Sequence, residues 1–238
     1  MVTPYDWQEG IGHRAQYVES RLAQGAPVLA VSLEAGVLLY TFRRQSRKIY
    51  EIYDQLVMAA IGQQSDVEAL RVAAIDFAHQ EGYNRSEQDV TIQRVVSALS
   101  GPVKKAFADF SSYPVVARAL FVEVGPTAEE DSYYTLDYDG DYSETCRSCF
   151  LSGDADLGGI FKERLAAIEP STSVEDALTA LRETWRASLP GGEPDGNEDE
   201  LTEEAVLVDR DPGRFNRFRV VGLDAINFAG GPPSDSSR

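Results

Sequence analysis

The sequence predicts an α+β protein, a four-layer αββα sandwich in which two antiparallel sheets lie between two helix layers, with an extra helix at the N-terminus. The predicted elements follow the order lone helix, strands, two helices, strands, two helices, strands, without the strict strand–helix alternation of a parallel sheet. The 238 residues, 43% of them hydrophobic, can fill one large core. We therefore expect one domain over residues 1–230.

The first element is a helix over residues 7–24. Asp6 and Glu9 have the spacing of a capping box, in which two side chains accept from the free backbone donors at a helix start. Gly25 is a typical helix end. Apolar residues recur every three or four positions and form one stripe: Ile11, Ala15, Val18 and Leu22.

Four consecutive strands follow as two hairpins. Their apolar character suits sheets that are covered on both faces, and short polar connections separate the partners, at Glu34–Ala35 and at Asp54–Gln55. The predicted strands cover residues 28–32, 36–42, 49–53 and 56–62.

The rest of the chain repeats the pattern of helix pairs and strands. Helical spacing of apolar residues predicts the helices, and strand periodicity returns after Pro114, with a turn at Asp139–Gly140. The predicted helices cover residues 66–80, 89–110, 156–167 and 174–188. The predicted strands cover residues 115–124, 132–138, 146–153, 204–209 and 214–221.

Charge and composition exclude several classes of function. A net charge of -17 repels phosphate backbones, so nucleic acid is not an expected partner. The sequence has no apolar run long enough for a membrane helix, and its N-terminus does not have the pattern of a secretory signal. We therefore expect a cytoplasmic protein without membrane contact. Residues 190–204 are predicted as an acidic, solvated loop and residues 231–238 as a disordered tail.

Several blocks, in order along nearly the whole chain, resemble the proteasome α-type subunits, especially those of the actinobacterial branch. They are QYVESRLAQGAPVLAVSLEAGVLL, RKIYEIYDQLVMAAIGQQSDVEALRVAAIDFA, SGDADLGGIFKERL and VLVDRDPGRFNRFRVV. The resemblance implies the N-terminal-nucleophile hydrolase fold and homo-heptameric rings. Two such rings would cap two rings of proteolytic β-type subunits, which degrade unfolded protein substrates.

In β-type subunits a threonine exposed after a glycine attacks the peptide bond, with its own amine as base. The matching residue here is Ala26, followed by Pro27, and it offers no hydroxyl or thiol. The resemblance therefore implies a non-catalytic subunit. The helix before the hairpin would line the axial face of the ring, and Pro4, Tyr5 and Asp6 would belong to a gate tail over residues 1–6. The family's usual gate motif is Tyr-Asp-Arg, whereas Trp7 follows Tyr5 and Asp6 here.

The resemblance also implies a docking pocket between neighbouring subunits for an AAA-type ATPase activator. Lys48 matches the lysine whose ammonium would pair with the C-terminal carboxylate of the activator, and Gly62 and Gln63 match the pocket wall. The alternatives are a solvated lysine beside Arg47 and an ordinary strand end. Phosphate-binding glycine patterns are absent from the sequence, so no cofactor is expected and ATP hydrolysis must come from the partner.

Other motifs favour structural roles. Cys146 and Cys149 have the spacing of a redox or metal motif, but they fall in one predicted strand and no second cysteine pair exists. DYDGDY lacks the glutamate that a calcium loop requires, so it predicts a hairpin turn. His13 and His79 are expected at helix surfaces. Two rivals stay open: a self-standing hydrolase that matures at an unrecognised Ser or Thr, and a ring-forming homologue without β-type partners.

Overall fold

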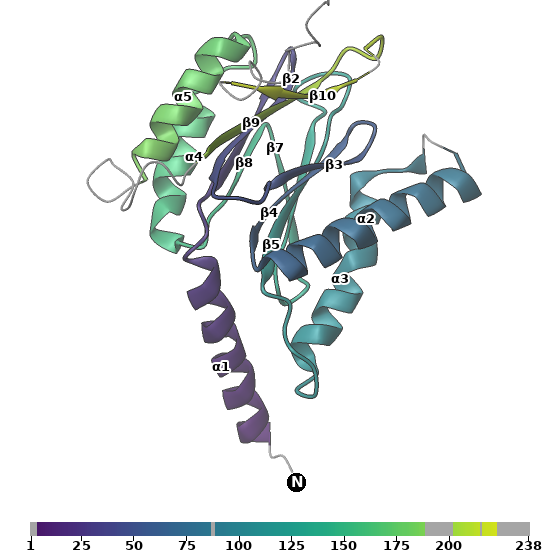
Figure 1. Ribbon diagram of the computed structural model, residues 1–238, viewed down its shortest axis with the longest axis vertical. Coiled ribbons are helices and arrows are strands. Elements are labelled where there is room, and N and C mark those ends of the chain that lie inside the picture. The colour runs from purple at the N-terminus through teal and green to yellow at the C-terminus, as the bar shows by residue number, and fades with distance from the viewer. Residues whose placement is uncertain (1–3, 87–88, 189–201, 215, 223–238) are drawn as a thin grey trace, which may run out of the picture.

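The protein, as a computed structural model, is described over residues 4–86, 89–188, 202–214 and 216–222 (Figure 1). It contains two five-stranded sheets in the orders β10-β9-β2-β1-β8 and β3-β4-β5-β6-β7. Every neighbouring pair of strands is antiparallel. The first sheet consists of β1 (Val28–Leu33), β2 (Gly36–Arg43), β8 (Ser148–Leu151), β9 (Thr202–Asp209) and β10 (Phe218–Val221). The second consists of β3 (Ile49–Tyr53), β4 (Leu56–Gly62), β5 (Ala117–Glu123), β6 (Ser132–Leu136) and β7 (Tyr142–Cys146).

Helices cover the outer face of each sheet, as Figure 1 shows. The α2 and α3 helices contact β3 to β6, whereas α4 and α5 contact β1, β2 and β8. Three apolar clusters follow from this arrangement, one between the sheets and one beneath each helix pair. The predicted four-layer sandwich is confirmed. The helices are α1 (Pro4–Leu22), α2 (Gln64–Asn84), α3 (Ile92–Ala108), α4 (Gly158–Ala166) and α5 (Val174–Arg186), with a 3-10 turn η2 (Ala155–Leu157) before α4.

The two N-terminal hairpins follow the predicted pattern closely. The strands β3 and β4 have the predicted bounds, and β1 and β2 each extend one residue further. The closing hairpin of β9 and β10 and the turn at Asp139–Gly140 are also present, with Gly140 at a φ of 85°. Helix α2 continues to Asn84, four residues into the predicted connection, and α3 begins at Ile92 rather than at Asp89.

The start of α1 differs from the prediction. The helix begins at Pro4, so Asp6 lies inside it and is not its N-cap; the predicted capping box is wrong. Proline is favoured in the first helical turn, because its missing N–H would have no helical acceptor there and its φ angle is already helical. Residues 4–6 of the predicted gate tail are therefore helical, and residues 1–3 lie outside the described part of the chain.

The predicted strand over residues 146–153 is two strands in different sheets. β7 ends at Cys146, Arg147 takes a left-handed φ of 66°, and β8 begins at Ser148. β7 pairs with β6 and β8 pairs with β1, so the chain crosses from one sheet to the other at Arg147. The exposed Cys146 and the buried Cys149 are free thiols on separate sheets, not two faces of one strand.

The predicted acidic loop extends too far. β9 begins at Thr202, and Thr202, Glu203 and Glu204 pair with residues 41–43 of β2. Glu204 is 6% exposed and cannot be part of a solvated loop. The backbone ladder with β2 takes these polar residues into the sheet. The remainder of that prediction, residues 190–201, and the predicted tail over residues 231–238 lie outside the described residues.

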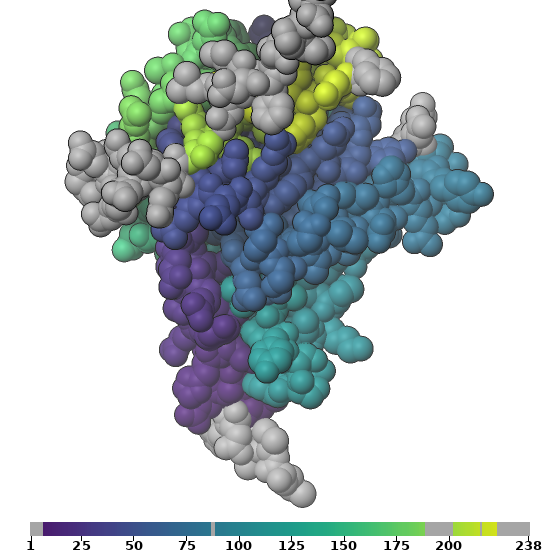
Figure 2. Space-filling model, viewed as in Figure 1, coloured from purple at the N-terminus to yellow at the C-terminus, as the bar shows by residue number. Residues whose placement is uncertain are grey.

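Helix α1 stands out from the body beside the end of α3 (Figures 1 and 2). Arg14 donates hydrogen bonds to the carbonyls of Ala106, Asp109 and Ser112, and its guanidinium lies 5.3 Å from the centre of the Phe110 ring. These contacts fix the helix against the end of α3. None of the helices in the described residues combines the length and the apolar character needed to cross a bilayer.

Candidate functional site

Lys48 is the centre of the candidate site. It lies directly before β3 and is half-buried. Its Nζ donates a hydrogen bond of 2.8 Å to the carbonyl oxygen of Ala26, in the loop between α1 and β1. Burial lowers the pKa of the Lys48 ammonium to about 8; the charge of Glu204 opposes this shift and that of Arg44 adds to it. The site therefore holds a cation that is partly desolvated.

Glu204 fixes the backbone on which Lys48 lies. One carboxylate oxygen accepts the N–H of Lys48 at 2.9 Å and the other accepts that of Ile49 at 3.4 Å. The guanidinium of Arg43 is 3.9 Å away. Burial raises the pKa of the Glu204 carboxyl, and the two backbone donors oppose that shift. Because Glu204 belongs to β9 and Lys48 precedes β3, this carboxylate ties the two sheets together.

The other predicted pocket residues lie at the same end of the β3–β4 hairpin. The N–H of Ala60 donates to the carbonyl of Lys48, so Lys48 lies across from Ala60, two residues before Gly62. Gly62 ends β4 with a φ of 131°. A Cβ atom there would lie 2.2 Å from the carbonyl oxygen of Val116. Both the backbone angle and the close approach require glycine at this position.

Gln63 is the N-cap residue of α2, and its side chain is exposed. Its backbone N–H donates to the carbonyl of Val116 at 2.7 Å, and Asp66 accepts the N–H of Val116 at 2.8 Å. The strand end and the first turn of α2 are thus held on β5. The fold brings Lys48, Gly62 and Gln63 to one edge, whereas their role in docking stays a prediction.

The Ala26–Pro27 segment completes this edge. The carbonyl of Pro27 accepts from the Thr41 hydroxyl at 2.8 Å and from the Trp185 indole at 3.1 Å. Together with the Lys48 contact at Ala26, these bonds fix the backbone just before β1. Residue 26 carries only a methyl group, so it offers no hydroxyl or thiol that could act as a nucleophile beside Lys48.

The predicted gate residues Pro4, Tyr5 and Asp6 form the first turn of α1, at the far end of that helix from Ala26. The structure thus separates them from the Lys48 edge by the length of α1 (Figure 1). Their function in a gate stays a prediction.

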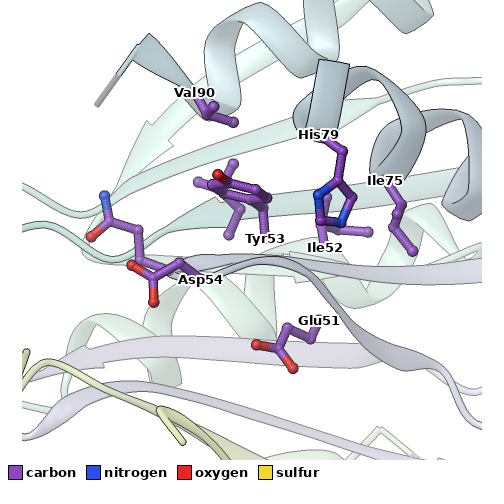
Figure 3. A pocket seen from close by; sticks show the side chains of 9 residues that line it. Glu51, Ile52, Tyr53, Asp54, Ile75, His79 and Val90 are labelled. Atoms are coloured by element: carbon purple, nitrogen blue, oxygen red, sulfur yellow. The ribbon is translucent and has the colours of Figure 1, made fainter. Parts of the chain in front are cut away.

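A cavity lies at the opposite end of the β3–β4 hairpin from Lys48 (Figure 3). This cavity of roughly 570 Å³ is lined by the β3–β4 turn and α2. His79, on α2, lies edge-on to Tyr53, with ring centres 5.3 Å apart. Burial, with the charge of Asp54 adding to it, raises the pKa of Glu51. His79 is exposed, as predicted for this helix, and so is His13. In the described ranges, no three His, Cys, Asp or Glu side chains are grouped to hold a metal ion.

Sequence reasoning missed Glu204 at this site. It stands at the end of an acidic run, where the predicted acidic loop and the predicted strand over residues 204–209 overlap, and its pairing with Thr41 places it in the strand. Its one sequence signal is the apolar stretch AVLV that follows it immediately. The polar contacts of Lys48 could not be predicted either, since they join residues 22 and 156 positions apart.

Comparison with known proteins gives a consistent result. Residues 23–199 match the family described as Proteasome subunit. A protein of Jonesia denitrificans named Proteasome subunit alpha is 32% identical over 220 residues, covering 90% of each chain. A protein of the same name from Xylanimonas cellulosilytica is 29% identical over 232 residues, covering 94% of each. A third, from Streptosporangium roseum, is 32% identical over 184 residues, covering 76% of this chain and 68% of the relative.

The family match covers most of the chain, and two of these relatives align with 90% or more of it. The chain belongs to the proteasome subunit family, as an α-type subunit of the kind found in actinobacteria.

Proposed function

We propose that this subunit is non-catalytic and forms the homo-heptameric outer ring of a cytoplasmic proteasome core particle. There it caps β-type subunits, gates the access of unfolded protein substrates and docks an AAA-type ATPase activator. Compartmentalisation is the physical logic of this arrangement. Only an unfolded chain can pass a narrow axial pore, so folded proteins are spared while the β-type subunits carry out the proteolysis.

The observation that carries this proposal is Ala26. A nucleophile of this fold needs a hydroxyl or thiol on the first residue of the hairpin and a free amine to act as its base. Residue 26 has neither, because its side chain is a methyl group and α1 is attached ahead of it. The hairpin instead serves to build the sandwich, and α1 is available to line the axial face of a ring.

The Lys48 edge supports the docking role. An ammonium has three donors, and within the described residues the Lys48 Nζ has one hydrogen-bond acceptor, the Ala26 carbonyl. The remaining donors suit a terminal carboxylate. Such an anion would also stabilise the charged form of Lys48, which burial disfavours. Gly62 brings the backbone at the end of β4 to the same edge, where an incoming peptide can approach it.

The projection of α1 supports the gate role. The helix extends away from the sandwich, and Pro4, Tyr5 and Asp6 are at its tip (Figure 1). Trp7 and Tyr17 are 49% and 47% exposed along its length. Aromatic side chains are enriched in the interfaces of protein assemblies. A ring in which α1 helices of neighbouring copies stand side by side would cover them and gather the N-termini around the axis.

Native mass spectrometry tests the proposal, on the chain expressed alone and with the β-type subunit of the same organism. We expect a seven-membered ring or a four-ring barrel, with each copy at its full mass of 26.1 kDa. A monomer shortened by cleavage ahead of β1 would overturn it and favour a self-standing hydrolase. Rings that never take up the β-type subunit would instead favour a homologue that assembles without β-type partners.

Two buried hydroxyls of the first hairpin argue against the rival proposal of a self-standing hydrolase. Ser32 is 1% exposed, and its hydroxyl shares a buried hydrogen bond of 2.7 Å with that of Tyr133. Thr41 is fully buried and donates to the Pro27 carbonyl. Neither hydroxyl of these two strand residues can reach a substrate without unfolding of the sheet.

A further inference from the structure

The segment over residues 43–48, from the last residue of β2 to the residue before β3, is strongly basic. Four of its six residues are cationic, namely Arg43, Arg44, Arg47 and Lys48, in a chain whose net charge is -17. Arg44 and Arg47 are exposed. We call this segment the basic loop. So dense a group of like charges costs free energy through mutual repulsion, unless an anionic partner offsets it.

The basic loop is held in place from two sides. Glu204 accepts the backbone N–H groups at its end, as described above. The hydroxyl of Tyr50 donates to the carbonyl of Arg47, and the guanidinium of Arg71 lies 5.5 Å from the centre of the Tyr50 ring. The loop is therefore attached to both β9 and α2, and its cations are presented beside the Lys48 edge rather than on a free tether.

The charge of Arg47 acts on the buried Glu204 carboxyl, but in the described ranges the carboxylates near the basic loop make no direct contact with its outer arginines. Glu204 is buried beneath it, and Glu68 is engaged by Arg71 in a hydrogen bond of 2.9 Å. Within the described residues, Arg44 and Arg47 form no ion pair. The charge of Arg44 contributes to the low pKa of Lys48, which places this guanidinium close to the ammonium. A positive rim thus adjoins the proposed carboxylate site.

We propose that the basic loop recognises acidic side chains of the docking partner, located a few residues ahead of the C-terminal carboxylate that Lys48 binds. The partner is then a protein tail with aspartates or glutamates upstream of its end. This inference rests on the docking role proposed above and adds its specificity. An extended tail spans about 3.3 Å per residue, so carboxylates three to five residues upstream lie about 10–16 Å from the terminus, beyond the immediate pocket.

The test uses the particle assembled with its β-type subunit and fluorescent ten-residue peptides that share their last three residues. Three upstream positions carry Asp, Asn or Lys, and the Asp and Asn peptides are also made with an amidated C-terminus. We expect the Asp peptide to bind roughly three- to tenfold more tightly than the Asn peptide at low salt, and the Lys peptide to bind least tightly. The advantage should shrink as salt is raised.

The variant Arg44→Gln/Arg47→Gln should remove the advantage of the Asp peptide and leave the affinity for the Asn peptide within about twofold. The matched control is Lys162→Gln/Arg164→Gln, which removes two exposed charges from α4 on the other helix layer. The control should retain the full preference for Asp. A retained preference in the Arg44/Arg47 variant would overturn the proposal.

Two further results would overturn it. Equal affinities for the Asp and Asn peptides would do so. Loss of ring assembly in Arg44→Gln/Arg47→Gln would show that the basic loop contacts a second copy. A failure of the docking role would be seen separately. In that case, neither amidation of the peptide C-terminus nor Lys48→Ala would lower the peptide affinity, whatever the upstream charge.

Discussion

Two cations at opposite ends of β1, Arg210 and Lys48, lie in opposite electrostatic environments. At the far end, Arg210 donates to the carbonyls of Leu33 and Thr127 at 2.8 and 2.9 Å and binds both oxygens of Asp131 at 2.7 and 2.8 Å. At the near end, the Lys48 ammonium has one hydrogen-bond acceptor within the described part of the chain, the carbonyl of Ala26. We call the first group the Arg210 clamp.

The two environments shift the cations in opposite directions. Hydrogen bonding to Asp131 raises the pKa of Arg210, whereas burial lowers the pKa of Lys48 to about 8. A charge whose donors are matched by a buried carboxylate fixes the loops around it. A charge that is positioned but not neutralised is ready for an external anion. The comparison teaches that the fold uses one cation for its own stability and keeps the other available.

The largest effect is expected for Asp131→Ala in the Arg210 clamp. The Asp131 side chain is 0% exposed, and its loss leaves a mostly buried guanidinium unpaired. The free energy of unfolding should fall by about 3–5 kcal/mol. Urea denaturation of the purified subunit measures it, with the exposed Asp76→Ala as a control that should change it by about 0.5 kcal/mol or less. A loss below about 1 kcal/mol would show that the clamp does not hold the loops.

The second largest effect is expected at Gly62, which ends β4 beside Lys48. Gly62→Ala places a Cβ 2.2 Å from the carbonyl oxygen of Val116 at a φ of 131°. It should destabilise the subunit by about 2–3 kcal/mol. Gly159→Ala in α4 is the matched control, since no atom beyond its chain neighbours and the helix's own nearby backbone lies within 4 Å of the added methyl. Because alanine favours a helix, the control should gain about 0.5–1 kcal/mol. Equal effects of the two substitutions would contradict the strained strand end.

The smallest effect concerns Lys48 and pH. Its folded-state pKa of about 8 lies below the ordinary 10.5, so the unfolded chain binds the extra proton between these values. The stability of the wild type should therefore rise through this window relative to Lys48→Met, by about 1–2 kcal/mol in a partly solvated site. Near pH 7 the Met variant should have its greatest relative advantage.

The measurement is urea denaturation of both chains at several pH values from 7 to 10. All other titrating groups are common to both, so the difference isolates Lys48. A difference that does not vary with pH would mean that Lys48 is as well solvated in the folded chain as in the unfolded one.

Most of the sandwich could be predicted from the sequence because its strands and helices have strong local patterns. The runs that form β3 and β4 are apolar stretches bounded by turn residues, and their bounds were predicted correctly. The absence of a nucleophile also needs only the identity of residue 26. These features depend on neighbouring residues and on composition, which one sequence contains in full.

The tertiary structure decided the rest. Every residue of β7 is exposed, so no apolar alternation marks it, and only its ladder with β6 makes it a strand. Glu204 is buried because β9 pairs with β2 and brings it under Lys48, 156 residues earlier in the chain. Asp131 and Arg210 meet across 79 residues. Polar side chains carry no periodic signal of their partners, so such pairs are fixed only when the sheets pack and water is removed from between them.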